Sequence, residues 1–171
     1  IVGPPGPVIV PEPPYWFGAK ARRPPFLLPR EFKARLTIPA DMPPGIVRYQ
    51  AANANGATGI GRFVVSSTPE VLEVDGREQP QQLDSLPVTV SGQVKKIEEV
   101  DRYRFVAPRT GPVTCTVVAR AIGSPLSAVL EIRDSSGDIV ADAADTSGDD
   151  TALTFNAEAG QSYTDSVYDV D

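Results

Sequence analysis

The stretch "DRYRFVAPRTGPVTCTVVARA", residues 101–121, contains two runs of alternating apolar and polar residues. In the first run Tyr103 and Phe105 share one parity, while Arg102 and Arg104 share the other. Because successive side chains of a β-strand point to opposite faces, this run predicts a strand with a buried side and a solvent-facing side. The second run predicts another such strand, whose inward residues are expected to be Cys115, Val117 and Ala119.

The rest of the C-terminal half repeats the pattern. In "SAVLEIRD", residues 127–134, every second residue is apolar, and these are expected on one face: Ala128, Leu130 and Ile132. Residues 134–138, "DSSGD", are expected to form a hairpin loop, because Asp, Ser and Gly supply local hydrogen bonds and positive φ angles. Three further segments complete the predicted set of strands, at 137–142, 151–157 and 161–169.

The N-terminal half is rich in proline and predicts a second group of strands. Twelve of the eighteen prolines precede Ile46, and the first 25 residues are expected to be extended rather than helical. Short strands are predicted at 32–38, 46–52 and 60–67, separated by turns that contain Gly, Pro and Asn. This combination favours an immunoglobulin-like β-sandwich.

We therefore predict an all-β chain of two tandem β-sandwiches. Residues 1–68 are expected to form the immunoglobulin-like sandwich with its proline-rich N-terminal arm, and residues 87–171 the second sandwich. Residues 69–86 are polar, break the alternation and contain two prolines, which favours a linker. The chain has no initiator methionine and ends within a predicted strand, so we expect a piece of a longer polypeptide, with the second sandwich truncated at its C-terminus.

The composition excludes several kinds of chemistry. The 171 residues include no histidine, which removes Ser-His-Asp and Cys-His catalysis and histidine metal sites. The single cysteine, Cys115, lies in an alternating apolar run and is expected to be a core residue. The net charge of −6 argues against nucleic acid as a partner, and no apolar run is long enough to span a membrane. We predict a protein that is not an enzyme.

Several motifs of the C-terminal half occur in a recognisable order. They are "LPVTVSGQV" (86–94), "DRYRF" (101–105), Gly111 before a long strand, "GSPLSAVLEIRDSSGDIVAD" (123–142), "GDDTALTF" (148–155) and "AGQSY" (159–163). This series resembles the bacterial pre-peptidase C-terminal domain. The upstream series "IPADMPPG" (38–45), "GRFVV" (61–65) and "PEVLEV" (69–74) is similar to an immunoglobulin-like unit that precedes this domain in large exported proteins of planctomycete-type bacteria.

The resemblance implies a jelly-roll-like β-sandwich with a non-catalytic accessory role and export to the periplasm, cell surface or extracellular space. Some relatives in that family bind calcium. The chain departs from the family at Asp165, which has the parity of Tyr163 and Val167, where an apolar inward residue is usual. A buried carboxylate is costly without a partner, so we expect a strand bulge, a cation or hydrogen-bond donor beside Asp165, or an irregular last strand.

Aspartates are frequent between residues 134 and 150 and raise the question of a calcium site. Calcium takes six to eight oxygen ligands, and the four aspartates that could converge are Asp142, Asp145, Asp149 and Asp150. Their spacing does not match an EF-hand loop. The other interpretation is a solvated acidic rim of the sandwich that binds no cofactor.

The N-terminal arm contains a candidate surface for protein partners. Tyr and Trp are frequent anchors at interfaces, and the arm carries three adjacent aromatic residues followed by a basic pair: Tyr15, Trp16, Phe17, Arg22 and Arg23. The basic pair could contact the Asp-rich end of another copy in a homo-oligomer, or the aromatic residues could plug the first sandwich.

Two functional classes follow from these observations. The first is a structural or assembly module of an exported protein or cell-envelope complex, whose partners are other chains or further domains of the same polypeptide. The alternative is an accessory module that binds polysaccharide or protein, with or without calcium. An exposed aromatic strip on a sheet face would favour binding, whereas a large one-sided apolar contact would favour assembly.

Overall fold

The chain is all-β, as predicted, with 47% of its residues in strands. The computed structural model describes residues 35–53, 56–96, 98–145 and 148–170, together with the strands β1 (Val8–Val10) and β2 (Phe26–Leu28), and these parts contain no α-helix. The chain divides into two compact units, one of residues 1–42 and 51–58 and one of residues 43–50 and 59–171. The units are described separately below.

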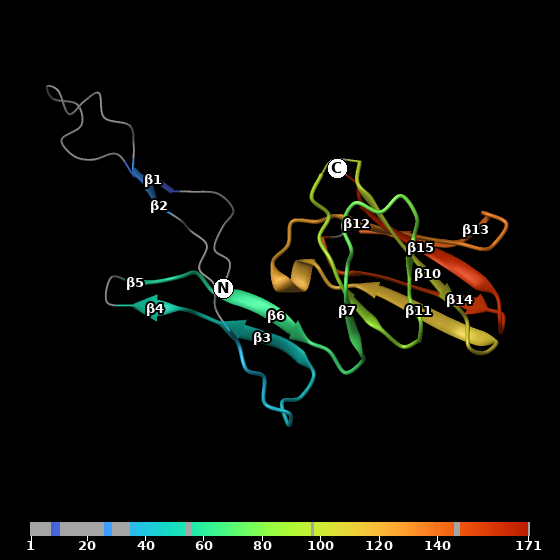
Figure 1. Cartoon of the computed structure of the whole chain (residues 1–171), viewed down its shortest axis with the longest axis horizontal. Coiled ribbons are helices and arrows are strands. Elements are labelled where there is room, and N and C mark those ends of the chain that lie inside the picture. Colours follow the sequence, from blue (N-terminus) through green and yellow to red (C-terminus); the bar gives the residue numbers. More distant parts are fainter. Residues whose placement is uncertain are drawn as a thin grey trace, which may run out of the picture. The chain divides into compact units, whose positions relative to one another are not determined.

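The larger unit contains a two-layer β-sandwich. One layer is a five-stranded sheet with the order β13 (Ile139–Ala144), β12 (Ala128–Arg133), β15 (Ser162–Asp169), β10 (Val100–Val106) and β8 (Gln81–Gln82). The other layer is the antiparallel pair β11 (Gly111–Val117) and β14 (Thr151–Ala157). Figure 1 shows β10, β12, β13 and β15 in one layer, with β11 and β14 beside it. The chain changes layer after β10, β11, β13 and β14, so strands from both layers contribute residues to the core.

The core lies between the two layers and includes Phe105, Leu130 and Ile132, as the alternation predicted. Phe105, Leu130 and Ile132 are almost fully buried on the inner face of the large sheet, and Leu153 and Phe155 face them from β14. The ring centroid of Tyr163 lies 5.9 Å from that of Phe105 and 5.0 Å from that of Phe155. Burying one side chain of this size contributes about 1.5–3 kcal/mol, so this aromatic and aliphatic layer holds the sheets together.

The segment 69–86, expected as a linker, carries two short strands. β7 (Glu70–Leu72) pairs in parallel with β9 (Thr89–Ser91), and β8 pairs in parallel with β10. The side-chain amide of Gln81 donates to the Leu72 carbonyl at 2.9 Å and accepts from the Val74 N–H at 2.8 Å. These bonds connect β8 to β7 and to the residue pair that follows it. A polar side chain of the segment expected to be a linker therefore makes a structural contact. The predicted extents of the two domains stay predictions.

The described part of the N-terminal half consists of two-stranded ribbons. In the larger unit β3 (Gly45–Tyr49) pairs with β6 (Gly61–Val65), and in the smaller unit β1 pairs with β2 and β4 (Ala52–Asn53) with β5 (Gly56–Ala57). The strand predicted at 32–38 is not formed over residues 35–38, which are exposed coil. Alternation alone was a weak signal there, because no partner strand pairs with the described residues of this segment.

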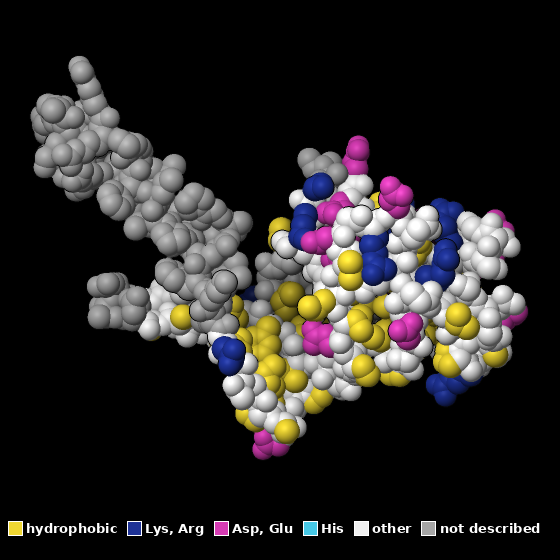
Figure 2. Space-filling model, viewed as in Figure 1, with side chains coloured by type: hydrophobic (Ala, Val, Ile, Leu, Met, Phe, Trp, Pro, Cys, Tyr) yellow, Lys and Arg dark blue, Asp and Glu magenta, His cyan; other side chains and the backbone are white. Residues whose placement is uncertain are grey.

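The β3–β6 ribbon has apolar side chains on both faces. Val47 lies opposite Phe63, and Ile46 lies opposite Val64. Ile46 and Val64 are exposed, and Figure 2 shows apolar side chains gathered over this ribbon. The immunoglobulin-like character of this half stays a prediction.

Asp165 lies inside the C-terminal sandwich in regular register, opposite Tyr103 on one side and Ile132 on the other. There is no bulge at this position and the last strand is regular, so two of the expected explanations are wrong. The thiol of Cys115, on the facing sheet, lies near the Asp165 carboxyl group, whose Oδ1 is buried without a hydrogen-bond partner in the described residues. A cation or hydrogen-bond donor beside Asp165 stays a prediction. Burial raises the pKa of Asp165 to about 6, and burial together with the Asp165 charge raises the pKa of Cys115 to about 12. Cys115 is thus a packed thiol with little thiolate character.

Asp165 should make the folded chain less stable as the pH rises from 4 to 7. Its folded pKa of about 6 exceeds its ordinary value of 3.8, so the folded state holds a proton that the unfolded state has released in this window. The resulting loss of stability is on the order of 3 kcal/mol by the end of the window. In urea unfolding, Asp165→Val should be more stable than the unchanged chain by a margin that grows between pH 4 and pH 7. A margin that stays constant across this range would contradict the burial of an ionisable carboxyl at this position.

Candidate functional site

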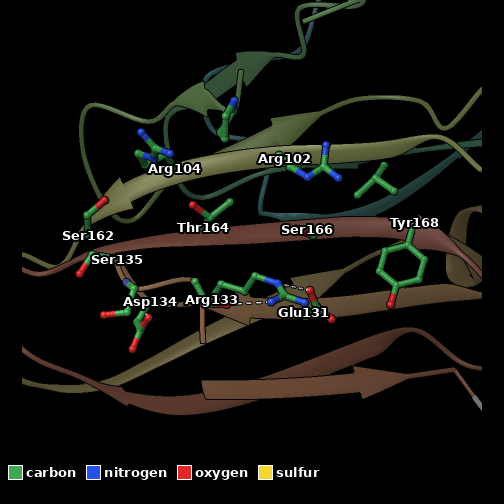
Figure 3. Close-up of a pocket in the computed structure, with 14 residues that line it drawn as sticks. Arg102, Arg104, Glu131, Arg133, Asp134, Ser135, Ser162, Thr164, Ser166 and Tyr168 are labelled. Atoms are coloured by element: carbon green, nitrogen blue, oxygen red, sulfur yellow. Dashed lines mark hydrogen bonds and ion pairs between the residues drawn. The ribbon is translucent and has the colours of Figure 1, made fainter. Parts of the chain in front are cut away.

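The outer face of the five-stranded sheet carries a groove of about 870 Å³, a volume typical of ligand sites. Its floor is formed by the outward residues of three neighbouring strands, and the loop between β12 and β13 closes one end. The lining residues are Pro80, Val100, Arg102, Arg104, Glu131, Arg133, Asp134, Ser135, Ser136, Gly137, Ser162, Thr164, Ser166 and Tyr168. Figure 3 shows side chains from β10, β15 and β12 side by side along this groove.

The register of the sheet places the lining side chains in rows across the strands. In one row Arg104 of β10, Thr164 of β15 and Arg133 of β12 are direct neighbours. Adjacent strands lie about 4.8 Å apart, so the two arginine backbones are about 10 Å apart with the Thr164 hydroxyl between them. The next row consists of Arg102, Ser166 and Glu131.

Tyr168 follows in the third row, between Val100 and Val129. The ring of Tyr168 lies at the end of the groove away from the hairpin loop, as Figure 3 shows. A tyrosine ring offers an apolar face and a polar hydroxyl at the same position. The groove therefore combines guanidinium groups, hydroxyl groups and one aromatic ring on a single sheet face.

Two of the three arginines are not neutralised by the described part of the protein. Arg133 donates to Glu131 Oε1 at 2.7 Å and to the Gly137 carbonyl at 2.7 Å, which fixes its guanidinium group. Arg102 and Arg104 are exposed, and their guanidinium groups make no hydrogen bond or ion pair to any residue that the structure describes. The groove therefore carries positive charge that is not paired within the described residues, although the whole chain has a net charge of −6.

The hairpin loop beside the groove forms as predicted. Asp134 Oδ1 accepts the N–H groups of Ser136 at 2.8 Å and Asp138 at 3.1 Å, and Gly137 adopts a positive φ of 90°. The pairing of β12 with β13 shifts register after Ile132, immediately before the arginine that the loop fixes. Bulges of this kind redirect side chains at sheet edges.

Two of the four candidate calcium residues, Asp145 and Asp150, make contacts within the protein around the turn at residues 120–122. The Asp145 side chain is 2% exposed, accepts the N–H groups of Gly148 and Asp149 on Oδ1, and pairs with Arg120 Nε at 3.2 Å through Oδ2. Asp150 Oδ1 accepts the N–H groups of Ala119 at 2.8 Å and Ala121 at 3.3 Å. These contacts hold the 3₁₀ turn η2 (Arg120–Ile122) against the start of β14.

The other two candidates, Asp142 and Asp149, are exposed, and Asp142 lies opposite Glu131 in the sheet. No group of three or more acidic or cysteine side chains in the described residues converges as metal ligands would. As arranged, the four aspartates do not offer the six to eight oxygens that calcium takes. Calcium binding stays a prediction, which a calcium titration of the melting temperature tests.

A second, smaller cleft carries a pair of carboxyl groups. It measures about 150 Å³ and lies between the β7–β8 connection and β10. Burial raises the pKa of Asp101 to about 7, together with the neighbouring Glu73 carboxylate, to which protonated Asp101 can donate. Glu73 Oε2 accepts the N–H of Gln93 at 2.7 Å. Asp101 could transfer a proton near neutral pH, but the cleft is smaller than a usual substrate site.

The residues proposed as partner-binding lie outside the described residues, namely Tyr15, Trp16, Phe17, Arg22 and Arg23. Within the described residues, no helix has the length and apolar character needed to cross a bilayer. No protein-family model matches the chain, and no curated protein matches it in sequence. The resemblance to the pre-peptidase C-terminal domain therefore stays a prediction.

The groove was not predicted as a site, although the sequence showed part of it. The outward parity of Arg102 and Arg104 was visible from the alternation, but their neighbours Thr164 and Arg133 come from strands far along the chain. A run of three outward hydroxyl residues with period two on residues 162–166 was the one further local signal.

Asp150→Ala should destabilise the chain by about 1–2 kcal/mol, because two N–H groups of the 3₁₀ turn lose their acceptor. Asp142→Ala is the matched control and should change the free energy of unfolding by less than about 0.5 kcal/mol, since this side chain is exposed. Urea unfolding of both variants measures the difference. Equal stability of the two variants would show that Asp150 does not hold this turn.

Proposed function

We propose that the chain is a non-catalytic accessory module of an exported bacterial protein and that it binds polysaccharide in the groove on the five-stranded sheet. The observation that carries this proposal is the set of outward side chains on β10, β12 and β15, which forms a groove of about 870 Å³. Bacterial origin and export, with a final location in the periplasm, at the cell surface or outside the cell, rest on the resemblance to the pre-peptidase C-terminal domain.

The polar lining supports a sugar as the ligand. The hydroxyl groups of a sugar need hydrogen-bond donors and acceptors. The groove supplies them through its guanidinium groups, the Glu131 carboxylate and the outward hydroxyl residues of β15. Tyr168 adds an aromatic ring on which the apolar face of a sugar ring can pack. The groove is open along the sheet and is not an enclosed apolar pocket, which suits a segment of a polymer.

The absence of catalysis is proposed on three observations. The chain contains no histidine, the Cys115 thiol is packed with a pKa raised to about 12, and the Glu73–Asp101 carboxyl pair lies in the small second cleft rather than in the groove. None of these carboxyl groups lines the groove where a polymer would lie.

Thr164→Trp should abolish binding, because the indole would fill the centre of the groove between two arginines. Thr116→Trp, on the exposed outer face of β11, is the control for a new surface tryptophan. Affinity electrophoresis through gels that contain single polysaccharides, neutral and acidic, measures the retardation. The proposal fails if no polysaccharide retards the chain, or if both variants are retarded as strongly as the unchanged chain.

A structural or assembly role is the second candidate, and the β3–β6 ribbon favours it. Ile46 and Val64 are exposed side by side on the ribbon, which has no third strand in the described residues. Open strand edges and exposed apolar side chains favour contact with another chain, with a further domain or with a second copy.

If this ribbon is an assembly surface, Ile46→Asp with Val64→Asp should reduce self-association or binding to the neighbouring domain. Sedimentation velocity of the unchanged chain and the double variant measures self-association. Identical monomeric behaviour of both proteins, at concentrations up to the millimolar range, would argue against assembly of copies through this surface.

A further inference from the structure

We infer that the groove selects a carboxylate-bearing polysaccharide, a polymer of uronic acid, through Arg102 and Arg104. This inference rests on the proposed function, namely that the groove binds polysaccharide. It begins from the charge of the groove, where two guanidinium groups are exposed without an ion pair in the described residues.

The spacing of the two guanidinium groups suits two charges along an extended ligand. Arg102 and Arg104 are two positions apart on β10, so their backbones are about 7 Å apart and their side chains leave the same face. Each guanidinium group can bind a carboxylate with two parallel hydrogen bonds. An uncharged ligand would leave both groups without their strongest partner.

The negative groups of the lining limit how densely the ligand can be charged. Glu131 is next to Ser166 in the row that begins with Arg102, and Asp134 lies at the hairpin end of the groove. Both carboxylates would repel a ligand with several charges on each ring, such as a highly sulfated polymer. They can accept hydrogen bonds from the free hydroxyl groups of a sugar acid, which carries one charge for each ring.

The position of the groove on the sheet disfavours an acidic peptide. Peptides commonly add to a sheet by pairing with the backbone of an edge strand. Here β10 and β15 each have a neighbour on both sides, and β12 lies between β13 and β15. The backbone of β12 and β15 is therefore paired on both sides, as is that of β10 at Tyr103 and Arg104, so a ligand in the groove is recognised mainly by side chains.

Polygalacturonate and its fully methyl-esterified form test the inference, because esterification removes the charge and keeps the sugar. Isothermal titration calorimetry should give affinity for polygalacturonate that falls as salt is added, and at least tenfold weaker affinity for the ester. Arg102→Gln with Arg104→Gln should weaken binding to polygalacturonate about tenfold and binding to the ester by clearly less, because the ester loses only hydrogen bonds and no charge pairs. Lys96→Gln with Arg109→Gln removes two exposed charges outside the groove and is the matched control.

A pair of lysine substitutions distinguishes guanidinium recognition from general attraction. Arg102→Lys with Arg104→Lys keeps the charge but loses the planar pair of donors, so affinity should fall between that of the unchanged chain and that of the glutamine variant. Circular dichroism and melting curves of all variants should be unchanged, since both side chains are exposed and have no described partner.

Three outcomes overturn the inference. Equal affinity for the ester and the acid would leave a neutral-sugar groove, so the proposed function would stand while its charge selectivity would fail. Tighter binding of dextran sulfate than of polygalacturonate would show that charge density, not a single carboxylate, is recognised. Loss of binding in the Lys96 and Arg109 control to the same extent as in the groove variant would show attraction to the whole surface.

Discussion

The register of β15 between β10 and β12 is the constraint on which both faces of the large sheet depend. Tyr163 lies opposite Phe105 in the core, and Thr164 lies opposite Arg104 on the outer face. Because side chains alternate along a strand, a shift of one residue would place Thr164 and Ser166 in the core and Tyr163 in the groove. The interlocked apolar residues of the two layers therefore also fix the order of the groove residues.

The inner face of the large sheet includes an ionisable residue, Asp165, whose carboxyl group costs free energy to bury. Asp165 is held between two core-facing neighbours, Tyr103 and Ile132, and its Oδ1 is buried without a hydrogen-bond partner in the described residues. A carboxyl group is costly to bury in this way, so burial dominates the rise of its pKa. A bulge at Asp165 would also displace the outward residues on either side, Thr164 and Ser166.

The sequence was sufficient for the parts of the fold that depend on local pattern. Tyr103, Phe105, Leu130 and Ile132 face the core as their parity predicted, and the loop at 134–138 forms through a local side-chain bond. Pattern was insufficient where the stabilising contact is distant. Residues 70–72 and 81–82 of the segment expected to be a linker pair in parallel with β9 and β10 further along the chain, contacts that polar composition cannot reveal.

The candidate sites show the same division. The acidic residues near 145–150 suggested a cation. In the structure Asp145 pairs with Arg120, and Asp150 accepts backbone N–H groups of the 119–121 segment, about thirty positions away in the chain. The groove joins β10 with β12 and β15, and only the pairing of these strands brings its arginines and hydroxyl groups together. Residue types were visible in the sequence, whereas their neighbours required the register.

Chemical-shift mapping of the isotopically labelled chain with a galacturonate oligomer tests most directly whether the outer face of this sheet binds the ligand. The account predicts shifts of the Nε–H signals of Arg102 and Arg104 and of amides in the row through Thr164, with little change in β11 and β14. Shifts centred on β11 and β14, or on the cleft beside Glu73 and Asp101, would contradict it.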